Sequence, residues 1–348
     1  MSLRSFIEAM PKIELNVQLE GSFEISRLLF ISEQYEIPET LKHYNDWVGL
    51  IRKPDYARLY DILRVANSWV RDGDDLSRLA YDLATKLHKQ RVRYAEVGVC
   101  PAYYPDCNLD FEGFFAAIND GRQRAERAWG IRMQWILNTF RDEPRRVEDT
   151  VRWGSSIPAQ RAGVIGVGLI GRDDLHSPAQ FEKPFRSAEK RELVRVVRVG
   201  ELTGRAGISD TLASLNPSRI LDARELWEDD DVMAQVVQQS VLVSFSPSRL
   251  IKQKWIENSA RLPIRKLLDR GVKLTVSSDQ STLYQTSLNQ EYILAAEADT
   301  LSSEEITDMA LTAITHSALP IEEKESLRQA FLDEIETLVV EHLTPEGK

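Results

Sequence analysis

The chain has 348 residues, a length that fits one large domain with a well-buried core. Hydrophobic residues make up 43% of it and the net charge is −10, with no long basic run, so we expect no nucleic-acid partner. No apolar run approaches a membrane span and the first ten residues lack the apolar core of a signal peptide, so we expect a cytoplasmic protein with no membrane partner. The two cysteines, Cys100 and Cys107, are predicted to be free thiols, as is usual in a reducing compartment.

The first expected element is a β-strand within residues 11–21, which have the sequence PKIELNVQLEG. Apolar and polar residues alternate strictly through it, a pattern typical of a strand with two different faces. The apolar residues are Ile13, Leu15, Val17 and Leu19. If this apolar face packs against helices, Asn16, Gln18 and Glu20 point together toward one polar site.

Residues 22–71 are predicted to form short helices that cap the mouth of the fold, with Ser22 as the N-cap of the first. This region is rich in aromatic residues, namely Tyr44, Trp47, Tyr56, Tyr60 and Trp69. A longer helix is expected to begin at Asp74 or Asp75, because leucines follow it at helical spacing at positions 76, 79, 83 and 87.

From residue 91 onward, short β-branched runs alternate with amphipathic helical stretches. The runs are 92–99, 131–139, 164–170, 194–199, 218–221, 241–245 and 272–278. Together with the first strand they make eight β/α units, the number in a TIM-type (β/α)8 barrel, and helices are expected to follow within residues 303–342. No low-complexity linker divides the chain, so we expect one α/β domain over residues 1–348 with a helical cap at 22–71.

Polar residues stand at the carboxyl ends of several predicted strands, which in a barrel meet at one mouth. They are Asn16, Gln18, Glu20, Arg198, Glu201, Asp222, Asp279 and Gln280. Several carboxylates beside an arginine favour a binding or catalytic site over a packed core. Each acidic residue alone also fits a second interpretation, in which it caps the following helix or faces solvent.

Seven segments, in order along the chain, resemble the adenosine and adenine deaminase family. The first strand has the frame of the family's His-x-His strand before Leu-(Asp/Glu)-Gly, with Asn16 and Gln18 in place of the histidines. The other segments are YAEVGVCP (94–101), GVGLIGRD (166–173), RVGE (198–201), RILDA (219–223), SFSPS (244–248) and GVKLTVSSDQS (271–281). This resemblance covers roughly residues 11–292 and implies the barrel fold of the family.

The resemblance also implies where zinc ligands would stand in this chain. In the family, two first-strand histidines, the histidine of His-Ala-Gly-Glu and the first aspartate of Ser-Asp-Asp hold zinc, which activates a water for attack on the amino-bearing carbon. The corresponding residues are Asn16, Gln18, Arg198 and Asp279. Amides are weak zinc ligands and an arginine stays protonated and cannot ligate, so we expect no zinc and no other cofactor.

Further family positions imply catalytic and substrate-binding roles. Glu201 stands at the glutamate that gives a proton to the purine ring, and Asp222 stands at the histidine that orients the attacking water. Gln280 replaces the second aspartate of Ser-Asp-Asp. Gly171 matches a glycine whose backbone contacts the purine, and Glu20 matches an acidic residue near the ribose or the cap.

We expect Arg198 to occupy the metal position and supply its positive charge, because strand alternation turns residue 198 inward. It would pair with Asp279, and with Glu201 or Asp222, since buried carboxylates require a partner. The alternative is that Arg198 faces solvent and the carboxylates are hydrated separately. The five histidines offer no replacement ligands, because none ends a predicted strand. They are His43, His88, His176, His316 and His342.

The leading hypothesis is a deaminase-like barrel that has lost zinc and hydrolytic deamination and binds a purine-like or other small molecule at its mouth. A second hypothesis keeps an active hydrolase or deaminase on a purine or related amino-heterocycle. In it, Asp279, Glu201 and Asp222 hold a hard cation such as magnesium or act as acid and base, and Arg198 binds an anionic substrate group. A third hypothesis is a structural role in an oligomer, and the sequence does not indicate which oligomeric state the protein has.

Overall fold

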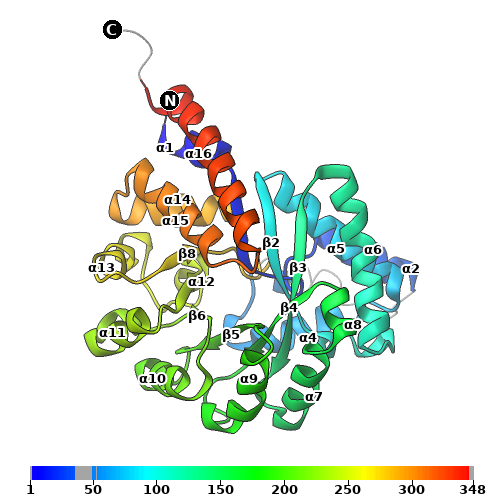
Figure 1. The fold of residues 1–348 in the computed structure, drawn as a ribbon. Helices are drawn as coiled ribbons and strands as arrows, with labels where there is room; N and C mark the ends of the chain where they lie inside the picture. Colours follow the sequence, from blue (N-terminus) through cyan, green and yellow to red (C-terminus); the bar gives the residue numbers. More distant parts are fainter. Residues whose placement is uncertain (1, 36–48, 52, 345–348) are drawn as a thin grey trace.

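The computed structural model describes residues 2–35, 49–51 and 53–344, and its eight parallel strands form one sheet in sequential order (Figure 1). The strands are β1 (Lys12–Gln18), β2 (Val92–Val99), β3 (Arg132–Phe140), β4 (Val164–Ile170), β5 (Val194–Val199), β6 (Arg219–Asp222), β7 (Leu242–Phe245) and β8 (Leu274–Val276). The barrel closes where Val17 bridges Asp279 and the Gln18 N–H donates to the Asp279 carbonyl at 3.0 Å. The predicted (β/α)8 barrel is confirmed.

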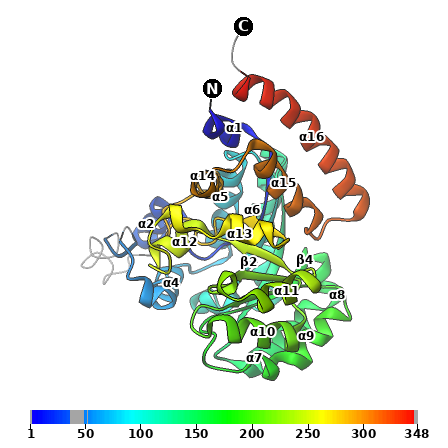
Figure 2. The ribbon, with the colours of Figure 1, turned by 90° about the vertical axis from the view of Figure 1, so that its left-hand side faces the viewer.

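Helices surround the sheet (Figure 1). They are α1 (Leu3–Ala9), α2 (Ile25–Gln34), α4 (Leu59–Asn67), α5 (Gly73–His88), α6 (Phe111–Trp129), α7 (Pro144–Gly154), α8 (Ile157–Arg161), α9 (Glu182–Glu189), α10 (Gly204–Leu215), α11 (Asp230–Gln238), α12 (Pro247–Lys252), α13 (Ile264–Asp269), α14 (Leu288–Asp299), α15 (Ser303–Thr315) and α16 (Ile321–Leu343). Figure 2 shows α16 extending beyond the barrel beside α1, where His342 Nδ1 lies 3.1 Å from Ser5 Oγ. No helix within the described ranges is long and apolar enough to cross a bilayer.

The segment predicted as a cap contains α2, a short 3-10 helix at Tyr56–Arg58, and α4. His43, Tyr44 and Trp47 lie outside the described residues. The long helix after it is α5, which begins at Gly73, one residue before the earlier of the two predicted starts, and its N-cap is Asp72.

The prediction that Ser22 caps the first helix is wrong, because α2 begins three residues later, after Glu24. The buried Ser22 hydroxyl instead donates to the Asp279 carbonyl at 3.1 Å and accepts from the Ser281 N–H at 3.3 Å. Ser22 therefore ties the end of β1 to the segment after β8, which is the seam where the barrel closes.

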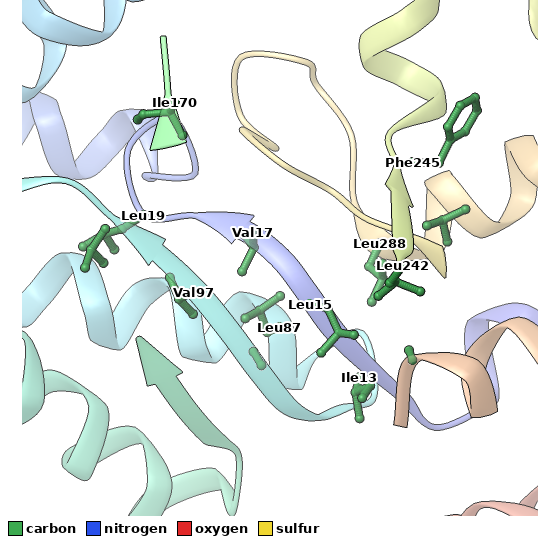
Figure 3. Close-up of a cluster of buried hydrophobic side chains, with 14 of the residues drawn as sticks. Ile13, Leu15, Val17, Leu19, Leu87, Val97, Ile170, Leu242, Phe245 and Leu288 are labelled. Atoms are coloured by element: carbon green, nitrogen blue, oxygen red, sulfur yellow. The ribbon is translucent and has the colours of Figure 1, made fainter. Parts of the chain in front are cut away.

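The two faces of β1 separate as its alternation predicts. Figure 3 shows its apolar side chains in one buried cluster with Leu87 of α5 and Val97 of β2. The apolar side chains are Ile13, Leu15, Val17 and Leu19, and burial of each contributes about 1.5–3 kcal/mol. The opposite face is polar and equally buried, with Glu14, Asn16 and Gln18 at most 5% exposed. This face lines the barrel interior.

The barrel interior is filled in layers. One layer is the buried ion pair between Arg219 and Glu96, whose atoms lie 2.8 Å apart, and another is the apolar cluster of Ile136, Val196 and Leu221. Layers of this kind make the barrel a packed core rather than a pore, so the site lies at the mouth.

The layer nearest the mouth is a chain of side-chain amides. Asn138 Nδ2 donates to Gln18 Oε1 at 2.7 Å, and Gln18 Nε2 donates to Asn16 Oδ1 at 2.6 Å. Two glycines of neighbouring strands make room for these amides. A Cβ at Gly98 would lie 2.1 Å from Gln18 Oε1, and one at Gly168 would lie 2.0 Å from Asn138 Oδ1.

Gly98→Ala is therefore expected to lower the free energy of unfolding by about 1–3 kcal/mol, because the new methyl group overlaps the amide chain. Urea denaturation measures this loss. The matched control is Gly49→Ala, where a Cβ meets no atom of the described residues within 4 Å and the stability is expected to stay equal or rise slightly. An equal effect of both substitutions would contradict the amide layer.

Candidate functional site

Arg198 lies at the centre of the mouth, near the end of β5, and bonds to carboxylates from two other strand ends. Its Nη1 is 2.7 Å from Asp222 Oδ2, its Nη2 is 2.7 Å from Asp279 Oδ1, and Glu201 Oε1 lies 3.5 Å from Nη1. The Arg198 side chain is 2% exposed and both aspartates are fully buried. The predicted inward orientation and pairing of Arg198 are confirmed.

A second buried arginine, Arg249 of α12, reaches the same carboxylates from the other side. Its Nη1 lies 3.0 Å from Asp279 Oδ2, its Nε lies 3.1 Å from Asp222 Oδ2, and its Nη2 bonds to Glu201. Nη1 also donates to the Tyr284 hydroxyl at 2.6 Å and to Gln280 Oε1 at 3.3 Å. We call Arg198, Arg249, Glu201, Asp222 and Asp279 the arginine–carboxylate cluster.

The backbone at the two aspartates is what aims their carboxylates at Arg198. Leu221 packs with the barrel interior, so a regular strand would turn Asp222 to the opposite side. Asp222 has a φ of +59° and Asp279 a φ of +46°, left-handed conformations that break the strand geometry. Such residues cost on the order of 1–3 kcal/mol each and persist only where the surrounding structure holds them in place.

Burial and charge compete within the cluster. Burial raises the pKa of the Asp222 carboxyl to about 6, against the lowering effect of Arg198 and Arg249. Burial and the neighbouring Arg249 lower the pKa of Arg198, but the three carboxylates raise it further, and the net shift is upward. Both arginines therefore stay charged, and they supply two positive charges against three carboxylates.

Asp173 positions the loop that carries Glu201. Its buried carboxylate accepts hydrogen bonds from the N–H groups of Gly200 at 2.8 Å, Glu201 at 3.1 Å and Leu202 at 3.0 Å. It also accepts from the Thr203 hydroxyl at 2.6 Å. A fifth donor is the Thr203 N–H at 3.5 Å, and together these bonds fix the backbone of the loop that carries Glu201.

A cavity of about 710 Å³ opens directly onto the cluster. Glu201 and Arg249 line its inner end, and residues 54–61, between β1 and α5, line another wall. Tyr60 and Trp255 are also part of the lining, and the buried hydroxyl of Tyr60 has no hydrogen-bond partner in the described ranges. The lining combines aromatic residues with several charged side chains, and the volume is in the range of small-molecule sites.

The remaining predicted site residues take different positions. Gln280 joins the cluster through Arg249, as given above, whereas Glu20 and Gly171 make none of the cluster's described bonds. The buried Glu20 carboxylate accepts from the Cys100 N–H at 2.9 Å, and burial raises its pKa to about 8. Gly171 follows β4 with a φ of +96°, and its neighbour Arg172 lines the cavity.

The amide oxygens of Asn16 and Gln18, which are the atoms that could ligate a metal, each accept a hydrogen bond from another amide in the barrel. Asn16 Nδ2 donates to Ser277 Oγ at 3.3 Å, in addition to the amide bonds described above. In the part of the chain that the structure describes, no three His, Cys, Asp or Glu side chains are grouped to hold a metal ion. Both cysteines are free, as predicted, and both are buried.

Sequence reasoning missed Arg249, Asn138, Tyr284 and Asp173. Arg249 directly follows the SFSPS segment, and Asp173 is the last residue of the GVGLIGRD segment. The resemblance therefore points to both segments but gives neither residue a role. Asn138 stands one position inside the end of the third predicted strand, at the same parity as the inward-facing Ile136. That parity is the one signal that could have identified it.

The adenosine deaminase family model matches residues 11–336 of this sequence. The chain belongs to the adenosine deaminase family. An aminodeoxyfutalosine deaminase of Streptomyces avermitilis is 26% identical over 91% of this chain and 89% of its own length. An adenine deaminase of Sinorhizobium medicae is 28% identical over 88% of this chain and 93% of its own length.

A solved structure of this fold is Arabidopsis ADAL complexed with IMP, with a TM-score of 0.85 and 21% identity. The match covers 96% of this chain and 100% of the Arabidopsis chain. At this identity the likeness establishes the fold alone.

Arg198→Met is expected to lower the free energy of unfolding by about 3–5 kcal/mol, because it leaves buried carboxylates without their partner. Chemical denaturation near neutral pH measures the loss. The control is Arg186→Met on α9, whose side chain is 63% exposed and pairs with Glu182, with an expected loss below about 1 kcal/mol. Similar small losses for both would contradict the central role of Arg198.

Glu20→Gln is expected to change the pH dependence of stability. The folded Glu20 carboxyl keeps its proton up to about pH 8, whereas the unfolded one loses it near 4.5, so wild-type stability falls as pH rises through this window. The neutral glutamine avoids that loss. The variant should match the wild type near about pH 5 and exceed it near about pH 8.5.

Denaturation curves at the two pH values measure this difference, with the exposed Glu257→Gln as control. The control should change stability by less than about 0.5 kcal/mol at either pH. A Glu20→Gln difference that does not grow with pH would show that the carboxylate is ionised at little cost in the folded protein.

Proposed function

We propose that this chain is a purine-binding member of the adenosine deaminase family in which Arg198 and Arg249 replace the zinc ion. We propose further that it does not carry out zinc-dependent deamination. One observation carries the proposal. At the position of a family zinc ligand, the Arg198 guanidinium lies 2.7 Å from both Asp222 and Asp279.

The residues at the four ligand positions do not fit zinc. Asp279 is the one family ligand retained, and both of its oxygens are ion-paired, Oδ1 with Arg198 and Oδ2 with Arg249. A zinc ion at Asp279 would lie beside two guanidinium groups, and like charges repel strongly in a buried site. Asn16 and Gln18 are weak ligands, and their amides are already engaged in the barrel layer.

The cavity supports binding of a purine. The Glu201 carboxylate at its inner end can accept a hydrogen bond from a ring N–H or an amino group, and the Arg249 guanidinium can donate to a ring carbonyl or nitrogen. The unpartnered Tyr60 hydroxyl adds a third polar group. Trp255 offers an apolar ring surface to the base. The IMP in the Arabidopsis relative supports a purine as the ligand class.

The alternative function is an active hydrolase or deaminase that uses another cation or carboxylate chemistry. It is favoured by the place of Glu201, the family's proton-donor position, which reaches the cavity and would face a bound ring. In this chain, however, Glu201 Oε1 is also ion-paired with Arg249, so its carboxylate is already engaged within the arginine–carboxylate cluster.

Purified without added metal, the protein is expected to contain less than about 0.1 zinc per chain by elemental analysis and to release no ammonia from adenosine or adenine. Adenosine should raise its melting temperature, since a ligand that binds only the folded state stabilises it. Glu201→Gln should weaken this shift, whereas the exposed control Glu228→Gln should not.

The outcomes separate the hypotheses. Stoichiometric zinc together with ammonia release would identify an ordinary zinc deaminase and contradict the proposal. Ammonia release without zinc would establish the alternative enzyme. Absence of a melting shift with purine bases or nucleosides and with their phosphates would contradict purine binding.

A further inference from the structure

We propose that the outer rim of the mouth cavity binds the phosphate of a purine nucleotide through Lys252 and Lys254, with Arg172 beside them. This inference rests on the proposed function, because it places the base of the same ligand at the inner end of the cavity. It specifies the ligand class as a nucleoside monophosphate rather than a nucleoside or free base.

The charge of the cavity differs in sign from that of the whole protein. Five cationic side chains line it, namely Arg58, Arg172, Arg249, Lys252 and Lys254. Three acidic side chains line it, namely Asp55, Asp61 and Glu201. The lining is therefore net positive in a chain whose net charge is −10. A concave positive region on an acidic protein attracts small anions and steers them to one place.

The cations of the lining differ in their partners. Arg249 is buried in the cluster, Arg172 bonds to Asp174 at 2.7 Å, and Arg58 lies 3.9 Å from Asp61. Lys252 and Lys254 are exposed, and neither forms an ion pair with any residue that the structure describes. They are the two cations of the lining whose charge is available to a ligand.

The polar groups that line the cavity differ in exposure, with buried groups at one end and exposed lysines at the other. Glu201 is 8% exposed and Arg249 is 1% exposed, so hydrogen bonds to a base form at the buried end. Lys252 ends α12, Lys254 follows two residues later, and Arg172 comes from the loop after β4. Trp255 also lines the cavity, and its ring centroid lies 5.6 Å from the Arg249 guanidinium carbon. A ligand with a flat ring at one end and an anion at the other matches this order.

A phosphate suits the rim better than a carboxylate-bearing base would. A phosphate monoester carries close to two negative charges at neutral pH and offers three acceptor oxygens, so both lysines can contact it together. Lysine is a flexible point charge that binds phosphate without a fixed geometry. The exposed position of both lysines predicts that their contribution falls as salt is raised.

The test compares adenosine with AMP as probes, using calorimetric titration of the full chain at low and at high ionic strength. The variant is Lys252→Gln/Lys254→Gln, which removes two charges at exposed positions. The matched control is Lys190→Gln/Lys273→Gln, which removes two charges from exposed residues before β5 and β8, at the opposite end of the barrel.

We expect wild type to bind AMP at least about tenfold more tightly than adenosine at low salt, with a smaller ratio at high salt. The Lys252/Lys254 variant should lose about tenfold in AMP affinity and keep its adenosine affinity, while the control pair keeps both. Equal affinities of wild type for AMP and adenosine, or an unchanged AMP affinity in the variant, would overturn this inference alone. Binding of neither probe would contradict the proposed function, and this inference with it.

Discussion

The mouth of this barrel depends on one interaction, the pairing of the buried Arg198 guanidinium with Asp222 and Asp279. The three residues come from β5, β6 and the segment after β8, so the pairing joins three strand ends at a single point. Aspartates at such positions repel one another when they are buried together, and something positive must lie between them. In this structure the Arg198 guanidinium supplies that positive charge.

The guanidinium at this place has consequences for the surrounding residues. A guanidinium is planar and donates in fixed directions, and Arg198 makes its two short contacts with Asp222 and Asp279, whereas Glu201 lies farther away, 3.5 Å from Nη1. Arg249, which enters from α12, also pairs with Glu201 and with the second oxygen of Asp279, and it is bonded in turn to Tyr284. The whole cluster is thus ordered without a ligand. Buried ion networks of this kind are sensitive to the loss of any member, although their net contribution to stability is small.

Much of the fold follows from local patterns. The alternation in β1 sets its two faces, and the spacing of β-branched runs sets the number of strands. The end of β8 does not follow from them, because residues 277–279 leave regular pairing to bond with β1 and β7 through side chains and single bridges. Ser22 lies in the same seam, but its sequence context also fits a helix N-cap. A serine that follows a strand gives the same local pattern whether it caps a helix or bonds to a distant strand end.

The candidate site was predictable to a similar extent. Strand parity alone turns Arg198 inward, and its pairing then follows from the cost of burying charge. The same parity would turn Asp222 away from Leu221, and only its left-handed backbone brings its carboxylate inward, which the family resemblance implied and periodicity did not. Arg249 could not be inferred, because it lies on a short helix whose inward face is set by tertiary packing. Glu20 bonds to the Cys100 backbone, a long-range contact that no sequence pattern encodes.

Anomalous X-ray diffraction at the zinc absorption edge, from crystals grown with excess zinc, tests the central claim most directly. The account predicts no anomalous peak among Asn16, Gln18, Arg198 and Asp279, with electron density for the Arg198 guanidinium between the two aspartates. A strong peak there with four ligands around it, and Arg198 turned away, would contradict it.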